Sequence, residues 1–325
     1  MEEQKYLFEI LKSRIPNQLR LVDVVEESLG ISADAAYKRI RGQKELSFSE
    51  LSALSKKFSL PLEEIFNYKS EQTAMFHYAP VCFSNFDGYI SYMEQMAAGL
   101  KALKSAPEKE ICFAAQDIPL FYFLKHTELA LFKLYAWNDA ATRERLSYRD
   151  FCNNFDMDKI TPIFEQIHSS YMAIPSKEIW TRQTVDTILR LLEYYCELEV
   201  FDSKKTVLLI LNQLNDLVDT VEKYAEVGYK ATKLAPYSLY VCSVDLENNF
   251  MLSRIGNEQS CRIKLYTINS MTTFNKGFCN ETAKWINDLI SKSILISGVS
   301  TRERYLFFQS SKNKIDALIN RIEAS

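Results

Sequence analysis

The sequence predicts a mainly α protein, in which an N-terminal helix-turn-helix domain precedes a larger α+β domain with a small antiparallel sheet. Three observations predict this class. Short amphipathic helices separated by turn residues fill residues 1–68. Helical periodicity recurs through much of 86–229, and apolar and polar residues alternate mainly after Pro236.

The helix-turn-helix prediction depends on the local chemistry of residues 20–66. Gly30 can adopt the positive φ that closes a helix, and Ser32 can cap the helix that follows. Ser47 with Glu50 forms a capping box that starts another helix. The apolar positions expected to build the small core are Val24, Val25, Leu29, Ala36, Ile40, Phe48, Leu51 and Leu54.

The rest of the chain divides by its periodicity. We expect a linker and an amphipathic connecting helix in 69–108, with the helix at 86–105, and a regulatory and dimerisation domain in 109–325. The predicted helices of that domain are 120–137, 158–171, 182–200, 204–229, 279–292 and 300–322. A strand is expected at 110–115 and a short one at 294–297, and the predicted three-stranded antiparallel meander comprises 238–245, 250–255 and 262–269.

Composition excludes several classes of protein. The 325 residues are 47% hydrophobic and 25% charged, as in an ordinary globular protein of two or three domains. A net charge of −3 excludes a generally basic nucleic-acid binder, so any affinity for DNA must come from a local patch. Such a patch exists around Gly42, where Lys38, Arg39, Arg41 and Lys44 lie within seven residues.

The exposed face predicted for the helix after Ser32 suits contact with DNA. With Ala36 and Ile40 facing inward, the outward residues are Ala33, Asp34, Tyr37, Lys38 and Arg41. Lysine and arginine can contact guanine or phosphate, tyrosine a thymine methyl or a phosphate, and aspartate the cytosine amino group. Arg39 is either a phosphate contact or a helix C-terminal charge without a role in DNA binding. The alternative for the whole face is an ordinary solvated surface.

Residues 20–66 resemble the DNA-binding domain of the lambda-repressor-like, or XRE-type, transcriptional regulators. The matching features are Leu29-Gly30, Ser32, Arg41-Gly42 and Leu62-Glu63-Glu64-Ile65-Phe66. The segment from Ala35 to Gly42 also resembles a BetR-type subgroup. The resemblance implies that Ser32, Ala33, Asp34 and Lys38 face bases or adjoining phosphates, with Arg41 near the backbone.

The family pattern differs from this chain at three places. A polar residue, often Gln, usually occupies the position of Val22, and a Ser or Thr commonly stands at Pro61. An apolar core residue is usual where this chain has Arg39, and a polar one where it has Ile40. The exchange at Arg39 and Ile40 matters because it determines how the helix after Ser32, the recognition helix of such a domain, is rotated about its axis. That rotation decides which side chains face the DNA.

We therefore expect a cytoplasmic, dimeric, sequence-specific regulator of transcription that binds double-stranded DNA. A single module makes few contacts, so two copies are expected to pair, through 86–105 or else through the helices of 182–229. The alternative is that the apolar faces of these helices only pack within their own domain. The other class of function is a protein-interaction adaptor or antitoxin-like protein, whose helical head binds a protein partner.

No catalytic residue, cofactor, metal site or membrane segment is expected. Glycine-rich phosphate loops and the common hydrolase and metalloprotease motifs are missing from the sequence, and no signal peptide or long apolar run occurs. The seven cysteines and three histidines lack metal-ligand spacing. A small-molecule effector is an open alternative, because one aromatic cluster forms either part of the core or the wall of a ligand pocket. The cluster consists of Phe121, Tyr122, Phe123, Phe132, Tyr135 and Trp137.

Overall fold

The computed structural model describes residues 2–14, 20–58, 60, 74–81 and 86–324. The chain divides into two compact units, Met1–Met75 and Phe76–Ser325. Pro61 and the segment 62–66, which contribute to the family resemblance, lie outside the described residues.

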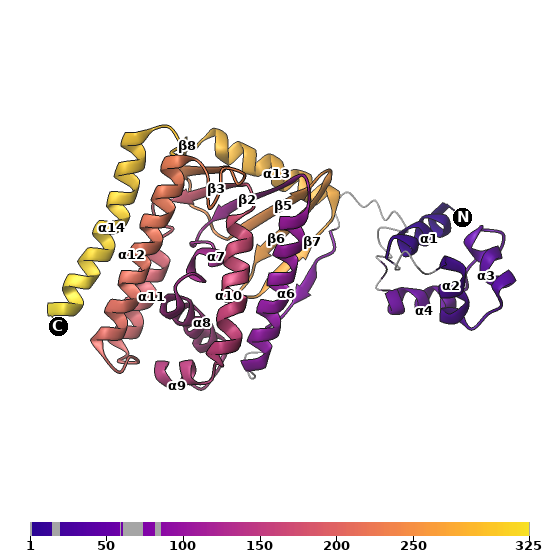
Figure 1. The fold of residues 1–325 in the computed structure, drawn as a ribbon, viewed down its shortest axis with the longest axis horizontal. Helices are drawn as coiled ribbons and strands as arrows, with labels where there is room; N and C mark the ends of the chain where they lie inside the picture. The colour runs from indigo at the N-terminus through magenta and orange to yellow at the C-terminus, as the bar shows by residue number, and fades with distance from the viewer. Residues whose placement is uncertain (1, 15–19, 59, 61–73, 82–85, 325) are drawn as a thin grey trace. The chain divides into compact units, whose positions relative to one another are not determined.

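The N-terminal unit is helical (Figure 1). Its described helices are α1 (Glu2–Arg14), α2 (Leu21–Leu29), α3 (Ala33–Ile40) and α4 (Phe48–Phe58). Gly30 ends α2 with a φ of 62°, and the Ser32 hydroxyl accepts a hydrogen bond from the Ala35 N–H at the start of α3. Glu50 accepts from the Ser47 N–H, and the Ser47 hydroxyl accepts from the Glu50 N–H. The predicted helix caps are confirmed.

A compact apolar core holds these helices together, and one predicted member is missing from it. The buried core residues are Leu7, Phe8, Leu11, Val22, Val24, Val25, Ala36, Leu54 and Leu60. Phe48 was predicted to join them, but it is 85% exposed. At 3.6 residues per turn, Phe48 lies about 120° around α4 from Leu54, which places it outside the buried face. The core prediction is wrong at Phe48.

The C-terminal unit is built around an eight-stranded mixed sheet with the order β1-β7-β6-β5-β2-β3-β4-β8. The strands are β1 (His77–Ala79), β2 (Lys109–Ala115), β3 (Ser176–Thr181), β4 (Tyr237–Cys242), β5 (Phe250–Ile255), β6 (Glu258–Lys264), β7 (Ser270–Thr273) and β8 (Ile294–Leu295). β2, β3 and β4 are parallel, and the other pairings of the sheet are antiparallel.

The predicted fold class is therefore wrong about the sheet, which is neither small nor purely antiparallel. The predicted meander fails at its first pairing, because β2 and β3 lie between β4 and β5. β3 was missed altogether. A central strand covered on both faces does not alternate between apolar and polar residues, and the Glu178-Ile179-Trp180 segment of β3 is buried throughout.

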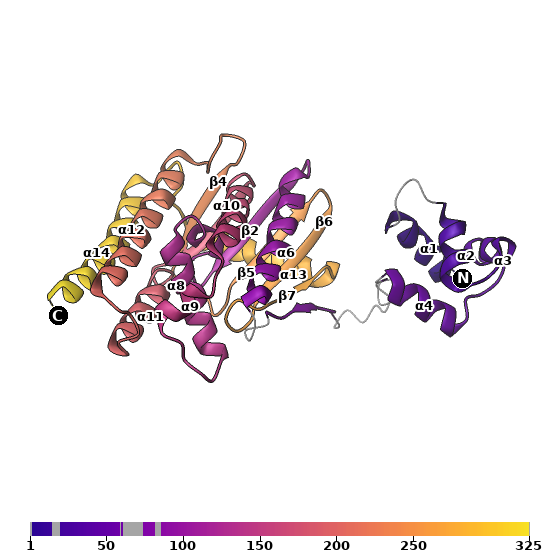
Figure 2. The same cartoon turned by 60° about the horizontal axis from the view of Figure 1, so that its bottom comes forward.

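Helices cover both faces of this sheet. Those of the C-terminal unit are α6 (Phe86–Ser105), α7 (Leu120–Phe123), α8 (Thr127–Ala141), α9 (Tyr148–Asn153), α10 (Met157–Met172), α11 (Asp186–Glu197), α12 (Lys204–Val227), α13 (Lys276–Ser291) and α14 (Thr301–Ala324). α13 shares one apolar cluster with Ala114 and Ile179 of the sheet. Ile111, Phe113 and Trp180 join the larger cluster of the other helices, whose arrangement Figure 2 shows after rotation.

The apolar stripes considered for dimerisation are used within the C-terminal unit. α6 packs against α10, and Tyr89, Met93, Met96 and Leu100 of α6 are buried in the larger cluster. α12 packs against α14 and α8. β1 and α6, which we had assigned to a linker and a connecting helix, are integral parts of this unit. Among the described residues, no helix is long and apolar enough to span a membrane.

Candidate functional site

The exposed face of α3 holds most of the residues predicted to meet DNA. Seven of them are exposed: Ser32, Ala33, Asp34, Tyr37, Lys38, Arg41 and Lys44. Ala36, on the opposite side of α3, is fully buried against the rest of the unit. The turn closed by Gly30 and Ser32 thus presents these residues together on one surface of the N-terminal unit.

Arg39 lies apart from that surface. Its side chain is 7% exposed, and its Nη2 atom lies 2.5 Å from Oε1 of Glu50. Nη1 donates to the Ala35 carbonyl at 3.0 Å. The hydrogen bond from Arg39 helps to hold the pKa of Glu50 below its ordinary value of 4.5. Arg39 is thus a basic residue in the last turn of α3, as in the second of the two alternatives that the sequence suggested, and its guanidinium pairs with Glu50.

The position of Arg39 also defines the rotation of α3. The family pattern places a core residue there, and in this structure Arg39 is more buried than Ile40, which is half-buried. A long side chain can fill a core position with its aliphatic part while its charged end is neutralised. In this case Glu50 of α4 neutralises it. The inward face of α3 therefore consists of Ala36 and Arg39, with the half-buried Ile40 packed against the same core.

Gln4 of α1 holds the end of α3 and the loop that follows. Its amide nitrogen donates to the carbonyls of Arg39 at 2.7 Å and Lys44 at 2.9 Å. Its amide oxygen accepts from the Leu46 N–H at 3.0 Å. The sequence reasoning missed Gln4 because its partners are 35 to 42 residues away. This amide positions the loop that carries Lys44.

The charged groups on the α3 surface are held weakly. Lys38 lies 2.7 Å from Asp34, and both side chains are more than half exposed. The Arg41 guanidinium lies over the Tyr37 ring, 5.5 Å from its centroid. Exposed ion pairs contribute about 0–1 kcal/mol. A phosphate group can therefore replace Asp34 as the partner of Lys38 at little cost.

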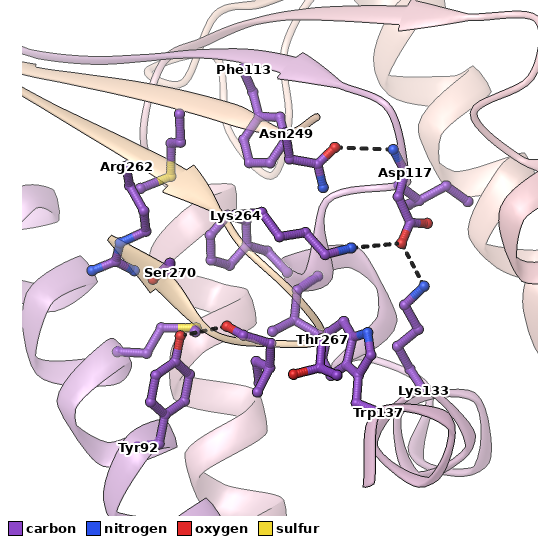
Figure 3. A pocket seen from close by; sticks show the side chains of 16 residues that line it. Tyr92, Phe113, Asp117, Lys133, Trp137, Asn249, Arg262, Lys264, Thr267 and Ser270 are labelled. Carbon is purple, nitrogen blue, oxygen red and sulfur yellow. Dashed lines mark hydrogen bonds and ion pairs between the residues drawn. The ribbon is translucent and has the colours of Figure 1, made fainter. Parts of the chain in front are cut away.

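A second candidate site is a pocket in the C-terminal unit, with a volume of about 80 Å³. It is lined by residues of β2, β5, β6, β7, α6, α7 and α8 and of the loops that follow β2, β4 and β6. Figure 3 shows the amino groups of Lys133 and Lys264 turned toward the Asp117 carboxylate. The distances to Asp117 Oδ2 are 2.5 Å from Lys133 and 3.4 Å from Lys264.

The Lys133–Asp117 pair is almost completely buried, at 2% and 4% exposure of the side chains. Burial alone would raise the pKa of Asp117, but the two ammonium groups outweigh it and leave that pKa lowered. Burial lowers the pKa of Lys133, and Asp117 opposes that shift. We conclude that Asp117 is ionised in the pocket wall. Its Oδ1 atom has no hydrogen-bond partner in the described part of the chain.

A third polar cluster surrounds Glu178 in β3 and has the character of a structural network. The Glu178 carboxylate accepts hydrogen bonds from the hydroxyls of Tyr122, Tyr171 and Tyr237 and from the Trp180 indole N–H. The amino group of Lys230 donates to the Tyr171 carbonyl at 2.7 Å. These groups satisfy one another and do not line the pocket.

The thiols and potential metal ligands offer little reactive chemistry. Burial raises the pKa of Cys112, Cys152, Cys196 and Cys261 to about 11, so these side chains are neutral thiols at neutral pH. Within the ranges that the structure describes, no three metal-ligating side chains are grouped. Cys82 lies outside those ranges.

Sequence reasoning found the α3 surface and missed the charged pocket. One signal for the pocket was present: Lys133 is the single charged residue in the apolar run 129–137 of α8. A lone lysine on an otherwise apolar helix indicates a buried partner. All six members of the aromatic cluster, for which core and pocket were the alternatives, lie in the larger core cluster, and two of them, Phe121 and Trp137, also line the pocket.

The chain matches no protein-family model, and comparison with curated proteins and with solved structures also gave no match. Function is therefore inferred from the residues and contacts of the chain itself.

Proposed function

We propose that this protein is a transcriptional regulator that binds specific DNA sequences by placing α3 in the major groove. The observation that carries the proposal is the helix pair α2 and α3, joined at Gly30 and Ser32, with seven polar or small residues exposed at the N-cap of α3, along the helix and just after it. In helix-turn-helix proteins the second helix of such a pair reads base edges and the first crosses the backbone.

The contacts follow from the placement of the side chains. Ser32, Ala33 and Asp34 are at the N-terminal end of α3, the end that approaches base edges in this docking mode. Lys38 reaches a base edge or a phosphate, and Arg41 and Lys44 reach the backbone. Arg39 is left out of the contacts because its guanidinium is buried against Glu50.

Two copies are needed for tight binding, because a single module buries too little surface on DNA. We propose a homodimer on two half-sites, spaced by about one helical turn of DNA. The described apolar stripes of α6 and α12 are used within the C-terminal unit, so the dimer contact uses other surfaces.

The proposal is tested by measuring affinity for duplex DNA against salt concentration. Each phosphate contact contributes a slope of about 0.9 in log affinity against log salt. Replacing Arg41 by alanine lowers that slope by about 1, and Lys38→Ala weakens binding by about 1–3 kcal/mol if Lys38 contacts a base.

The matched control is Lys56→Ala, which removes the same charge from an exposed position on α4. We expect it to leave both affinity and slope close to those of the unaltered protein. Absent or salt-insensitive DNA binding would instead favour a helical head that binds a protein partner.

A further inference from the structure

The pocket of the C-terminal unit combines apolar walls with an excess of positive charge. Its apolar lining includes Phe113, Phe121, Trp137 and Met251. Its charged lining consists of Asp117, Lys133, Arg262 and Lys264. One carboxylate faces three cationic groups, so two positive charges are in excess. A partly open pocket with this charge attracts an anion.

Two of these cations lie where a helix-covered sheet usually carries apolar residues. Alternate residues of a strand point to opposite faces. On β6, Cys261 and Ile263 are buried in the cluster beneath α13, whereas Arg262 and Lys264 line the pocket on the other face. The inner face of β6 is therefore built for polar contact.

Two polar groups of the pocket lack a full set of protein partners within the described residues. Arg262 donates from Nε to the Thr272 hydroxyl at 3.3 Å, and among the described residues its terminal nitrogens have no carboxylate partner. The buried Thr267 hydroxyl has no hydrogen-bond partner in the same part of the chain. In Figure 3, Arg262 lies on the opposite side of the pocket from Asp117. A guanidinium in this state can bind a carboxylate through two parallel hydrogen bonds.

The volume limits the size of the ligand. An engineered cavity of about 150 Å³ in another protein holds one benzene molecule. The present pocket, at about 80 Å³, has roughly half that volume. It therefore accommodates a carboxylate with a short apolar chain better than a large ring system. Bare inorganic phosphate would leave the apolar wall without a partner.

We propose that this pocket binds a short-chain organic carboxylate, with the carboxylate on Arg262 and the apolar chain against Trp137 and Met251. Lys264 adds positive charge beside the site while remaining close to Asp117. This ligand site lies wholly within the C-terminal unit and is independent of the proposed DNA contacts.

Calorimetric titration of the full-length protein with butyrate tests the proposal. A ligand this small binds in roughly the millimolar range. We expect saturable binding of butyrate, much weaker binding of its neutral isostere butyramide, and none of n-butylamine or inorganic phosphate. Arg262→Gln should weaken butyrate binding at least about tenfold, the effect of losing a charge-assisted hydrogen bond.

Two further variants make the result decisive. Arg254→Gln is the matched control, because Arg254 is a half-exposed arginine of β5 that pairs with Glu110 and does not line the pocket. Ser270→Leu, at a small residue that lines the pocket, should fill the space and abolish binding. Equal binding of butyrate and butyramide, equal effects of the two arginine variants, or no binding of butyrate would each overturn the proposal.

Discussion

Replacing Arg39 by methionine separates a structural role for this residue from a role in DNA binding. Methionine keeps much of the apolar length of the side chain and removes the guanidinium that Glu50 neutralises. Removing one partner of a fully buried ion pair costs about 3–5 kcal/mol, whereas an exposed pair contributes about 0–1 kcal/mol. The two side chains are 7% and 17% exposed, between these limits. We expect Arg39→Met to lower the free energy of unfolding of the N-terminal unit by about 2 kcal/mol.

Glu50 has a second role that its own variants can separate. It also accepts the capping hydrogen bond from the Ser47 N–H. Glu50→Gln keeps an oxygen for the cap and loses the charge, whereas Glu50→Ala loses both. The free energy of unfolding of the alanine variant should therefore be about 1 kcal/mol lower than that of the glutamine variant. The double variant of Arg39→Met and Glu50→Gln measures the coupling within the pair, which we expect to be about 1 kcal/mol or more.

The assay uses urea denaturation of the full chain followed by two signals. All three tryptophans, Trp137, Trp180 and Trp285, belong to the C-terminal unit, so their fluorescence reports that unit alone. Far-ultraviolet circular dichroism reports the helices of both units. Arg39→Met should shift part of the dichroism transition and leave the fluorescence transition in place. A coupling within about 0.3 kcal/mol of zero, or a loss of DNA affinity as large as that of Arg41→Ala in the folded variant, would refute the structural assignment.

Three other predictions test the caps and the buried charges. Gly30→Ala should destabilise the N-terminal unit by about 1 kcal/mol, because a φ of 62° strains a residue with a Cβ. Apart from the chain neighbours, no atom lies within 4 Å of the new methyl group, so a clash adds nothing to this cost. The midpoint of the dichroism transition measures the loss of stability. Lys133→Met should destabilise the C-terminal unit by about 3–5 kcal/mol, because it leaves the buried Asp117 carboxylate with only the more distant Lys264 as a partner. A fluorescence midpoint equal to that of the unaltered protein would contradict this prediction. Burial lowers the pKa of Lys230 to about 7 from an ordinary 10.5, so the unfolded chain binds the extra proton between these values, and the contribution of Lys230 to the free energy of unfolding of the C-terminal unit should rise from pH 7 toward pH 10. Lys230→Met should reduce that rise, which urea midpoints at several pH values would show.

Features made by neighbouring residues could be predicted from the sequence. The positive φ at Gly30, the cap at Ser32 and the capping box of Ser47 and Glu50 each depend on groups within a few residues. The exposure of Lys38 and Arg41 followed from helical periodicity. Local hydrogen bonding and the helical repeat are sufficient for predictions of this kind.

Features made by distant residues could not be predicted in the same way. The pairing of β2 with β3 joins segments separated by four helices, and neither strand shows the alternation that marks a half-exposed strand. Asp117 and Lys264 meet across 147 residues. Arg39 has a charge pattern typical of a DNA contact, and only the position of Glu50 on the packed α4 shows that its charge is already neutralised.

The most direct test of the proposed function is selection of bound sequences from a pool of random duplex DNA by the full-length protein. We expect one enriched motif made of two inverted half-sites, with centres about one helical turn of DNA apart. Selection with the Lys38→Ala, Arg41→Ala double variant should lose this enrichment, while the Lys56→Ala variant should retain it. Recovery of no enriched sequence, or of the same motif with the double variant, would contradict recognition of DNA by α3.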